Sequence, residues 1–446
     1  MYDTIRLPMT RVLLVCADFV GSSMAGPGIR YWELARHLGR HADVILAIPN
    51  TPVIHGDTFR IVQYEPHQLR ALLGWCDVLV AQGFRLPMSA LYFTRKVLVI
   101  DLYDPLPLEL LEQFRGVSTH RARLTQRYVA IHLHHLLRIG DFFLCAGERQ
   151  RDFWLGMLAA AGRLNRFTYA DDPLFRNLLA VVPFGLPTES PCRSAPLLRG
   201  VHPGLGDADR ILLWGGGVWE WLDPLTVIRS MERVSAKRND VKLLFMGLRH
   251  PNPGVQPTRM LGQAIALARS LDLEGRSVFF NPDWVPYERR QDALLEADVG
   301  VSAHLEHAEA RFAFRTRLLD YLWAGLPVVC TRGDELAETI EARGAGFVVA
   351  PGDAAGWAET LLRFLDDDAV HRQCRIAAQN LAREMTWPRV LAPLVEFCRR
   401  PTAAADRGRR SLATDLAALT SYGWGVGRAV LRNRGLGRVR QRLLGW

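Results

Sequence analysis

The stretch LDYLWAGLPVV, residues 319–329, contains the change of secondary structure that decides the fold. Its first residues continue a helical pattern that starts at residue 317, and Gly325 and Pro327 are typical of the end of a helix. The apolar run at residues 328–330 is too short for a buried helix and follows a turn, which predicts a strand buried on both faces. A helix that leads directly into such a strand is typical of a parallel sheet.

The same alternation extends outward to both ends of the chain. A first set of apolar runs predicts strands at residues 12–16, 44–48, 78–81, 97–100, 142–145 and 180–182. A second set predicts strands at residues 211–214, 241–246, 278–280, 299–302, 328–330 and 347–350. Helical patterns lie between strands at residues 31–39, 224–236, 263–271, 287–297 and 317–324. We therefore expect an α/β protein of two doubly wound domains, residues 1–187 and 203–385, with a polar linker between them and ligands bound in their crevice.

The composition is that of an ordinary folded protein. Of the 446 residues, 49% are hydrophobic and 23% are charged, which excludes a largely disordered chain, a fibre and a small disulfide scaffold. The seven cysteines are scattered without a C-x-x-C pair, which argues against a disulfide framework or a zinc site and fits a reducing cytosol. Since no run of about 18 apolar residues is present, we expect no membrane span.

The positive charge is concentrated at the C-terminal end of the chain. The net charge is +9, but residues 401–446 hold nine arginines and two aspartates, so this segment alone accounts for +7. A nearly neutral body is unlike a nucleic-acid-binding domain, so we expect no nucleic-acid partner. The basic segment instead predicts an anionic partner.

Two loops of the first domain carry candidate site residues. The sequence GPGIR at residues 26–30 precedes a helical pattern, so Gly26, Gly28 and Arg30 are candidates for holding an anion or a sugar; the alternative is a tight strand–helix loop. Asp101, Tyr103 and Asp104 follow the carboxyl end of a predicted strand, where substrates bind in such sheets. For Asp104, which precedes a proline, the alternative is helix capping.

The second domain carries a glycine loop and a charged helix start. Gly216 and Gly217 follow a predicted strand and leave room for a diphosphate, although a structural turn is the alternative. Farther on, Arg315 and Arg317 lie where a helix begins, a combination that suits a diphosphate. A carboxylate one turn later, Asp320, can accept two hydrogen bonds from sugar hydroxyls. The alternative is a surface helix in which Arg317 pairs with Asp320.

In these motifs the chain resembles glycosyltransferase family 4, retaining nucleotide-sugar enzymes of the GT-B fold with two facing Rossmann-like domains. The resemblance covers about residues 10–398. It depends on the motifs at residues 26–30, 182–185, 298–301, 319–329, 332–336 and 346–353. It also implies that residues 386–400 form a helix that crosses back to the first domain.

The resemblance assigns roles to residues of the second domain. Asp320 stands where the family's second motif glutamate binds the nucleotide ribose. The first motif glutamate is expected eight residues earlier, at Phe312, and Glu309 is the nearest carboxylate. The Arg and Lys that bind the diphosphate in the family are missing from the first turn of the domain, and Arg315, Arg317 and Arg249 are the candidates to replace them.

Further roles follow from the same resemblance. Tyr103 stands where many relatives have a histidine that contacts the sugar. Trp284 and Val285 lie in the loop that edges the nucleobase. The expected catalytic residues are Asp101, Tyr103, Glu309 and Arg315. Neither the histidines at residues 132–135 nor the aspartates at residues 366–368 have the spacing of a metal site, so we expect none.

The leading interpretation is a metal-independent retaining glycosyltransferase without a cofactor. It would transfer a sugar from a nucleotide-diphosphate sugar to a saccharide or lipid-linked acceptor, in polysaccharide or glycolipid assembly. It would do so by front-face displacement, in the cytoplasm at the inner face of the membrane. Two alternatives remain: an epimerase or phosphorylase of the same fold, and a non-catalytic protein that binds nucleotide sugars.

The C-terminal residues 401–446 suggest how the protein would reach that membrane. Leu412, Leu416 and Leu419 share one helix face, and arginines alternate with leucine and tryptophan through the segment. This pattern predicts a basic amphipathic segment that binds an anionic membrane surface. The alternatives are a solvated end, packing on the protein body and contact with nucleic acid.

Overall fold

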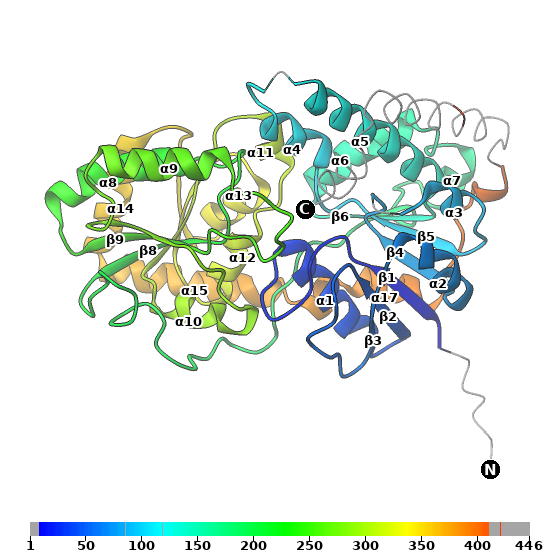
Figure 1. Ribbon diagram of the computed structural model, residues 1–446, viewed down its shortest axis with the longest axis horizontal. Helices are drawn as coiled ribbons and strands as arrows, with labels where there is room; N and C mark the ends of the chain where they lie inside the picture. The colour runs from blue at the N-terminus through cyan, green and yellow to red at the C-terminus, as the bar shows by residue number, and fades with distance from the viewer. Residues whose placement is uncertain (1–8, 85, 118, 410–419, 421–446) are drawn as a thin grey trace, which may run out of the picture.

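The computed structural model describes residues 9–84, 86–117, 119–409 and 420, which form two α/β domains side by side (Figure 1). The first domain has a seven-stranded sheet of order β3-β2-β1-β4-β5-β6-β7. Its strands are β1 Arg11–Val15, β2 Asp43–Ile48, β3 Arg60–Gln63, β4 Val78–Ala81, β5 Val97–Asp101, β6 Phe142–Cys145 and β7 Leu179–Val181. The second domain has a six-stranded sheet of order β10-β9-β8-β11-β12-β13. Its strands are β8 Arg210–Gly215, β9 Val241–Met246, β10 Val278–Asn281, β11 Val299–Ser302, β12 Val328–Thr331 and β13 Gly346–Val349.

Helices cover both faces of the first sheet because its strands are apolar on both sides. Val12 and Leu14 of β1 belong to one buried cluster, which includes residues of the first helix, whereas Leu13 and Val15 belong to the opposite cluster. The helices are α1 Gly26–Leu38, α2 Leu69–Trp75, α3 Met88–Tyr92, α4 Leu106–Gln113, α5 His120–Ile139, α6 Glu148–Ala160 and α7 Arg166–Asp171, with a 3-10 turn η1 at Pro66–Gln68. Each face of the sheet therefore has its own hydrophobic core.

The second domain has the same layered arrangement, and contacts with its sheet hold the helix that carries Arg317 and Asp320. Its helices are α8 Pro224–Lys237, α9 Arg259–Ser270, α10 Arg290–Glu296, α11 Ala308–Phe312, α12 Thr316–Trp323, α13 Glu335–Ala342, α14 Ala354–Asp366 and α15 Asp368–Glu384, with a 3-10 turn η2 at Tyr287–Arg289. A side chain at Gly300 of β11 would place its Cβ only 2.4 Å from the ring of Tyr321. The Tyr321 hydroxyl accepts a hydrogen bond from the backbone N–H of Gly215, at 2.7 Å. These contacts hold α12 beside the end of β8.

The chain returns to the first domain after α15. The backbone N–H of Trp387 donates to the carbonyl of Leu186, and the Trp387 side chain is fully buried. Two helices follow, α16 Trp387–Val390 and α17 Ala392–Arg399, and Phe397 stacks on Phe142 with ring centroids 4.2 Å apart. Residues 401–409, including a 3-10 turn η3 at Arg407–Arg409, then lie against the first domain. Most of the predicted amphipathic segment, residues 410–419 and 421–446, lies outside the described residues.

The two-domain α/β fold expected from the sequence is confirmed. Strand β3 was not predicted, because this short edge strand is only half-buried and has no continuous apolar run. The expected glycine loop at residues 26–30 is instead the first turn of α1, in which a proline near the start is favourable. No helix in the described ranges is long and apolar enough to cross a bilayer.

Candidate active site

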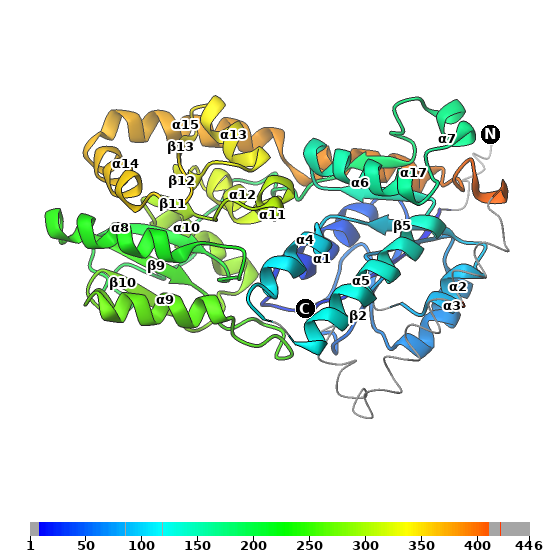
Figure 2. The same ribbon diagram turned by 90° about the horizontal axis from the view of Figure 1, so that it is seen from above.

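A cavity of about 260 Å³ lies between the two domains, next to the carboxyl ends of β5 and β8. Figure 2 shows α11 and α12 on the side of the second domain that faces α1 and α4 of the first. Of the residues expected to form the site, Gly26, Tyr103, Asp104, Gly216, Gly217, Trp284, Val285, Glu309, Arg315, Arg317 and Asp320 line this cavity. The expected residues Gly28, Arg30, Asp101 and Arg249 do not line it.

Arg317 is a cation without an acidic partner at the floor of the cavity. It lies in the first turn of α12, and its Nη2 donates to the carbonyl of Gly217 at 2.9 Å. Its guanidinium carbon lies 4.7 Å from the centroid of the Trp214 ring. The Nη1 atom is buried and makes no hydrogen bond, and no carboxylate among the described residues pairs with this arginine. Burial lowers the pKa of Arg317 to about 10, so it stays protonated at neutral pH.

Arg315 is in a different electrostatic state, although it lies only two residues earlier. Its Nη1 and Nη2 donate to the two carboxylate oxygens of Glu309 at 2.9 and 2.6 Å, and both side chains are buried. Burial opposes the charge of this arginine, but Glu309 compensates and the pKa of Arg315 is raised. Arg315 was expected to contact the diphosphate, but its guanidinium is already paired with Glu309. Both carboxylate oxygens of Glu309 are occupied by this ion pair, so Glu309 is not a free carboxylate.

Asp320 lies at the cavity with about one third of its side chain exposed. The predicted alternative, an ion pair with Arg317, does not form. Instead, Nε of Arg290 donates to Oδ1 of Asp320 at 3.2 Å, and the Arg290 guanidinium lies over the Tyr287 ring. Asp320 Oδ2 accepts no hydrogen bond from any described residue, so it is open to a ligand.

Phe312 occupies the position where the family's first motif glutamate was expected. Its ring lies 5.2 Å from that of Phe153 in α6 of the first domain. Its carbonyl accepts a hydrogen bond from Nε2 of Gln150, also in α6. This position therefore makes an apolar contact between the domains and does not carry the expected carboxylate.

Aromatic side chains form one wall of the cavity. The rings of Trp219 and Trp221 are stacked 5.6 Å apart, and the His250 ring meets the edge or face of Trp219 and Trp284 at 5.8 and 5.5 Å. Nε1 of Trp284 donates to the carbonyl of Met24, which ties this wall to the first domain. Sequence reasoning missed His250; the W-x-W pattern after the glycine loop was the available signal for the aromatic wall.

The opposite wall, from the first domain, is acidic and holds protons near neutral pH. Burial and the nearby Asp101 raise the pKa of Asp104 to about 7, and Gln82 donates to its Oδ2 at 2.9 Å. Burial raises the pKa of Glu109 well above its usual value, and repulsion from Asp104 and Glu309 adds to this. Glu109 was missed by sequence reasoning; the signal was a carboxylate in the helix that starts directly after Asp104 and Pro105.

Arg30 and Asp101 stabilise the first domain and do not line the cavity, which corrects their expected roles in the site. They form a fully buried ion pair, with Nε and Nη2 of Arg30 at 2.8 and 2.9 Å from the two oxygens of Asp101. Arg30 also donates to the carbonyls of Val182 and Pro183. Every charge of the pair is satisfied inside the domain, so Arg30 is not available to an anion.

Two other expected residues lie outside the site for different reasons. Gly28 is needed for packing, because a Cβ there would lie 2.3 Å from the carbonyl oxygen of Phe19. The side chain of Arg249 is 77% exposed and points to Asp283 at 3.8 Å. Exposed charges at that distance interact weakly in water. Within the described ranges, no group of three or more His, Cys, Asp or Glu side chains is arranged to hold a metal ion.

Comparison with known proteins agrees with the two-domain fold. Residues 209–367 match the family model described as "Glycosyl transferases group 1". No curated protein sequence matches the chain significantly. Among solved structures, HepE of Anabaena in complex with UDP is 13% identical with a TM-score of 0.57, and the match covers 87% of this chain and 99% of that one. The glycosyltransferase WaaG, involved in lipopolysaccharide biosynthesis, is 17% identical with a TM-score of 0.59, covering 88% of this chain and 100% of that one.

A third similar structure is sucrose-phosphate synthase from Thermosynechococcus elongatus. It is 15% identical with a TM-score of 0.59, and the match covers 88% of this chain and 98% of that one. The structural matches therefore extend over both domains, whereas the family match lies within the second. Residues 209–367 of the second domain therefore resemble the glycosyl transferases group 1 family, and the whole chain has the two-domain GT-B fold.

Proposed function

We propose that this protein is a retaining glycosyltransferase that uses a nucleotide-diphosphate sugar as donor. The observation that carries the proposal is Arg317, whose Nη1 is buried without a partner beside the glycine loop of the second domain. A cation kept in a cavity without a counter-ion is costly unless an anion binds there. The UDP complex of HepE supports a nucleoside diphosphate as that anion.

The donor would lie along the second-domain side of the cavity. Its diphosphate would contact Arg317, the backbone N–H groups at the start of α12 and the glycine loop at Gly216 and Gly217. The ribose hydroxyls would donate to Asp320, whose Oδ2 is open. The base would lie against the aromatic wall that includes Trp284. Every part of a nucleoside diphosphate thus meets a group of complementary chemistry.

The same groups would assist the chemical step. When the bond between the sugar and the diphosphate breaks, negative charge grows on the leaving phosphate, and a positioned guanidinium stabilises that charge most in the transition state. The bond from the acceptor oxygen to the sugar forms on the face that the diphosphate leaves. The acceptor proton passes to a leaving phosphate oxygen, and the sugar keeps its configuration. Glu309 is bound by Arg315, which argues against a carboxylate nucleophile.

The acceptor would enter from the first-domain side, where Tyr103, Asp104 and Glu109 line the cavity. Carboxyl groups that hold protons near neutral pH can donate as well as accept hydrogen bonds, which suits hydroxyl groups. We further propose that transfer needs neither a divalent metal nor a cofactor, because Arg317 and α12 supply the positive charge. The acceptor would be a saccharide or a lipid-linked sugar at the inner face of a membrane, in polysaccharide or glycolipid assembly.

Binding of UDP tests the donor site directly. Isothermal titration calorimetry of the full chain should show that Arg317→Ala weakens UDP binding by about tenfold to a hundredfold, the effect of losing hydrogen bonds to a charged group. The matched control is Arg249→Ala, which removes an exposed arginine outside the cavity and should leave the affinity unchanged. Equal affinities of wild type and Arg317→Ala would contradict the assignment.

Turnover is tested separately from binding. Incubation with UDP-glucose and other UDP-sugars should release UDP, and nuclear magnetic resonance of the transferred or hydrolysed sugar should show retention at the anomeric carbon. Tight UDP binding without release from any nucleotide sugar, across a panel of acceptors, would favour a non-catalytic binding protein. Conversion of the donor to an epimer would favour the epimerase.

A further inference from the structure

The first turn of helix α6, in the first domain, lies against the second domain. The backbone N–H groups of Glu148 and Arg149 donate to the two carboxylate oxygens of Glu335 at 3.4 and 3.3 Å. Glu335 is the first residue of α13, so a carboxylate of the second domain caps a helix of the first. Gly147 permits this approach, because a Cβ there would lie 2.5 Å from one of the Glu335 oxygens.

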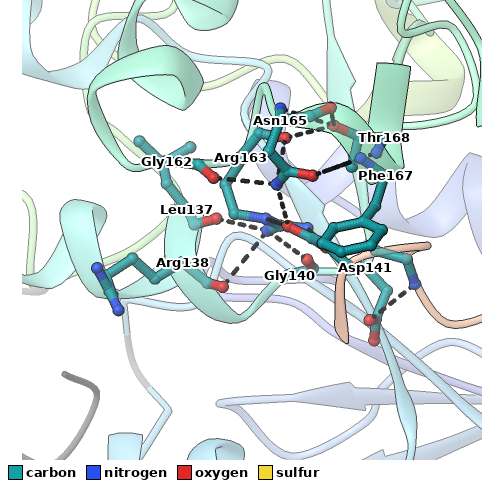
Figure 3. Close-up of polar contacts among 11 residues, drawn as sticks. Leu137, Arg138, Gly140, Asp141, Gly162, Arg163, Asn165, Phe167 and Thr168 are labelled. Atoms are coloured by element: carbon teal, nitrogen blue, oxygen red, sulfur yellow. Dashed lines mark hydrogen bonds and ion pairs between the residues drawn. The ribbon is translucent and has the colours of Figure 1, made fainter. Parts of the chain in front are cut away.

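The opposite end of α6 is fixed inside the first domain, as Figure 3 shows. Arg163 follows the end of this helix and is buried, and its Nη1 donates to the carbonyls of Leu137 and Gly140 at the end of α5, at 2.7 Å each. Its Nε and Nη2 pair with the buried carboxylate of Asp406 at 2.9 and 3.1 Å. These contacts hold α6 in place between α5 and residues 401–409, so its first turn has a defined position in the first domain.

Gln150, in that first turn, forms a bridge between the two domains. The side chain is buried, and its Nε2 donates to the carbonyl of Tyr103 at 2.8 Å and to the carbonyl of Phe312 at 3.2 Å. Its Oε1 accepts a hydrogen bond from the backbone N–H of Ala146 at 2.6 Å, which fixes the orientation of the amide. A single amide group thus contacts the backbone of both domains.

Both of these carbonyls belong to segments that line the cavity. Tyr103 lines it directly and precedes Asp104 of the acidic wall. Phe312 is the last residue of α11, and the chain continues from it through residues 313–316 to Arg317 at the floor of the cavity. Gln150 therefore connects the wall where the acceptor would bind to the segment that leads to the diphosphate site.

We propose that Gln150 is a positioning residue for sugar transfer, because its two hydrogen bonds set the separation between the acceptor wall and the donor site. The proposal rests on the proposed function, but it gives Gln150 no contact with either substrate, since this residue does not line the cavity. Reacting atoms must lie about 3–3.5 Å apart, and a misplacement of about 1 Å can slow an enzyme about a hundredfold. A hydrogen-bonded bridge between the two walls would maintain that geometry.

The kinetic test compares wild type with Gln150→Leu in the release of UDP from UDP-glucose and other UDP-sugars. We expect kcat to fall about tenfold to a hundredfold, because the two walls are no longer held together. The KM for the donor and the Kd for UDP should stay within about threefold of wild type, since Arg317 and Asp320 are unchanged. The matched control is Gln263→Leu, the same substitution at an exposed position of α9, which should behave as wild type does.

Hydrogen–deuterium exchange of the full chain with UDP tests the bridge without turnover. In Gln150→Leu, the backbone around Tyr103 and the backbone around Phe312 should both exchange faster than in wild type, because one amide holds both segments. If Gln150→Leu does not fold, Gln150→Glu serves both experiments. Its carboxylate can still accept the hydrogen bond from Ala146, but it cannot donate to the two carbonyls.

Three outcomes would overturn the proposal. Wild-type kcat in the Gln150 variant would show that the bridge does not position the reacting groups, while UDP release by wild type would leave the proposed function intact. Faster exchange around Tyr103 alone would show that Gln150 acts only within the first domain. An equal loss of UDP affinity and of kcat would place Gln150 in donor binding. Absence of UDP release by wild type from every nucleotide sugar would instead contradict the proposed function itself, and the proposal with it.

Discussion

Arg30 and Arg317 each lie near the start of a helix, one in each domain, and they have opposite surroundings. Each lies in the first turns of a helix beside the cleft, and each has an aromatic ring 4.7 Å from its guanidinium carbon. Arg30 is fully enclosed, paired with Asp101 and bonded to two carbonyls. Arg317 lines the cavity, with a single carbonyl as its partner. The first arginine holds its domain together, whereas the second is free to bind a ligand.

This difference teaches that the position of an arginine at a helix start does not define its function. The deciding factor is whether a carboxylate from a different element of the fold pairs with that arginine. In the first domain Asp101 at the end of β5 does so. In the second domain the nearby carboxylates, Glu309 and Asp320, are taken by Arg315 and Arg290. Arg317 has no carboxylate partner because both of these nearby carboxylates are already paired with other arginines.

The largest expected effect comes from breaking the closed pair. Arg30→Ala leaves the buried carboxylate of Asp101 without compensation, so the free energy of unfolding should fall by about 3–5 kcal/mol. Denaturation with urea, followed by circular dichroism, measures this change. The double variant Arg30→Met/Asp101→Leu should recover most of the loss, because both charges are removed together. A loss below about 1 kcal/mol in the single variant would show that this pair is not essential to the domain.

The open arginine should respond in the opposite way. Arg317→Leu removes a cation that has no acidic partner, so the melting temperature without ligand should stay the same or rise. Saturating UDP should raise the melting temperature of wild type more than that of the variant, since a ligand that binds only the native state stabilises it in proportion to its affinity. The lost stabilisation should correspond to about 1.5–3 kcal/mol of binding free energy. Thermal denaturation with and without UDP measures both changes, and a strongly destabilised variant would contradict the comparison.

The acidic wall should make stability depend on pH. Asp104 has a native pKa of about 7, above its value in an unfolded chain, so the native state holds a proton that the unfolded state has released. The stability contributed by that proton is complete at low pH and is lost as the pH rises toward 7. Asp104→Asn should remove this pH-dependent loss. At pH 8 the free energy of unfolding of the variant should exceed that of wild type by about 1–2 kcal/mol, a value reduced because the Asp104 side chain is partly exposed to solvent.

The control for that measurement is an exposed carboxylate. Asp57→Asn changes a side chain at the surface, so its unfolding free energy should follow that of wild type at every pH. Urea denaturation at pH 5, 6, 7 and 8 compares the three proteins. Parallel curves for wild type and Asp104→Asn would show that this carboxyl group titrates normally.

The smallest expected effect concerns divalent metal. If Arg317 supplies the positive charge at the diphosphate, UDP affinity in a chelator should stay within a few-fold of the affinity in magnesium. Calorimetry in the two buffers measures the difference. Binding that disappears in the chelator would mean that a metal ion, and not Arg317, compensates the diphosphate.

Much of the fold was predictable from the sequence because apolar runs report burial directly. Strands such as β4 at Val78–Ala81 and β9 at Val241–Met246 have the predicted bounds, since both faces of each sheet are covered by helices. The edge strand β3 escaped prediction because its exposed side chains interrupt the pattern. The candidate site was predicted as a set of loops, and most of these do line the cavity.

The partners within that site could not be predicted, because they come from distant parts of the chain. The spacing of Arg317 and Asp320 suggested an ion pair, but Arg290, brought close by the packing of α10 beside α12, takes Asp320 instead. Likewise, Asp101 is 71 residues from Arg30 in sequence. Local spacing shows which pairs are possible within one helix, and only the packing of separate elements selects among the remaining partners.

The sequence by itself determined that this protein has two parallel-stranded α/β domains with a glycine loop and a charged helix start in the second. It did so because periodicity and turn residues act over short distances. The tertiary structure decided which charges are neutralised, that Arg30 serves folding while Arg317 is open, and that the end of the described chain is fixed to α5. Those decisions depend on how two sheets and their helices pack, since an ion pair forms only where that packing brings opposite charges within reach.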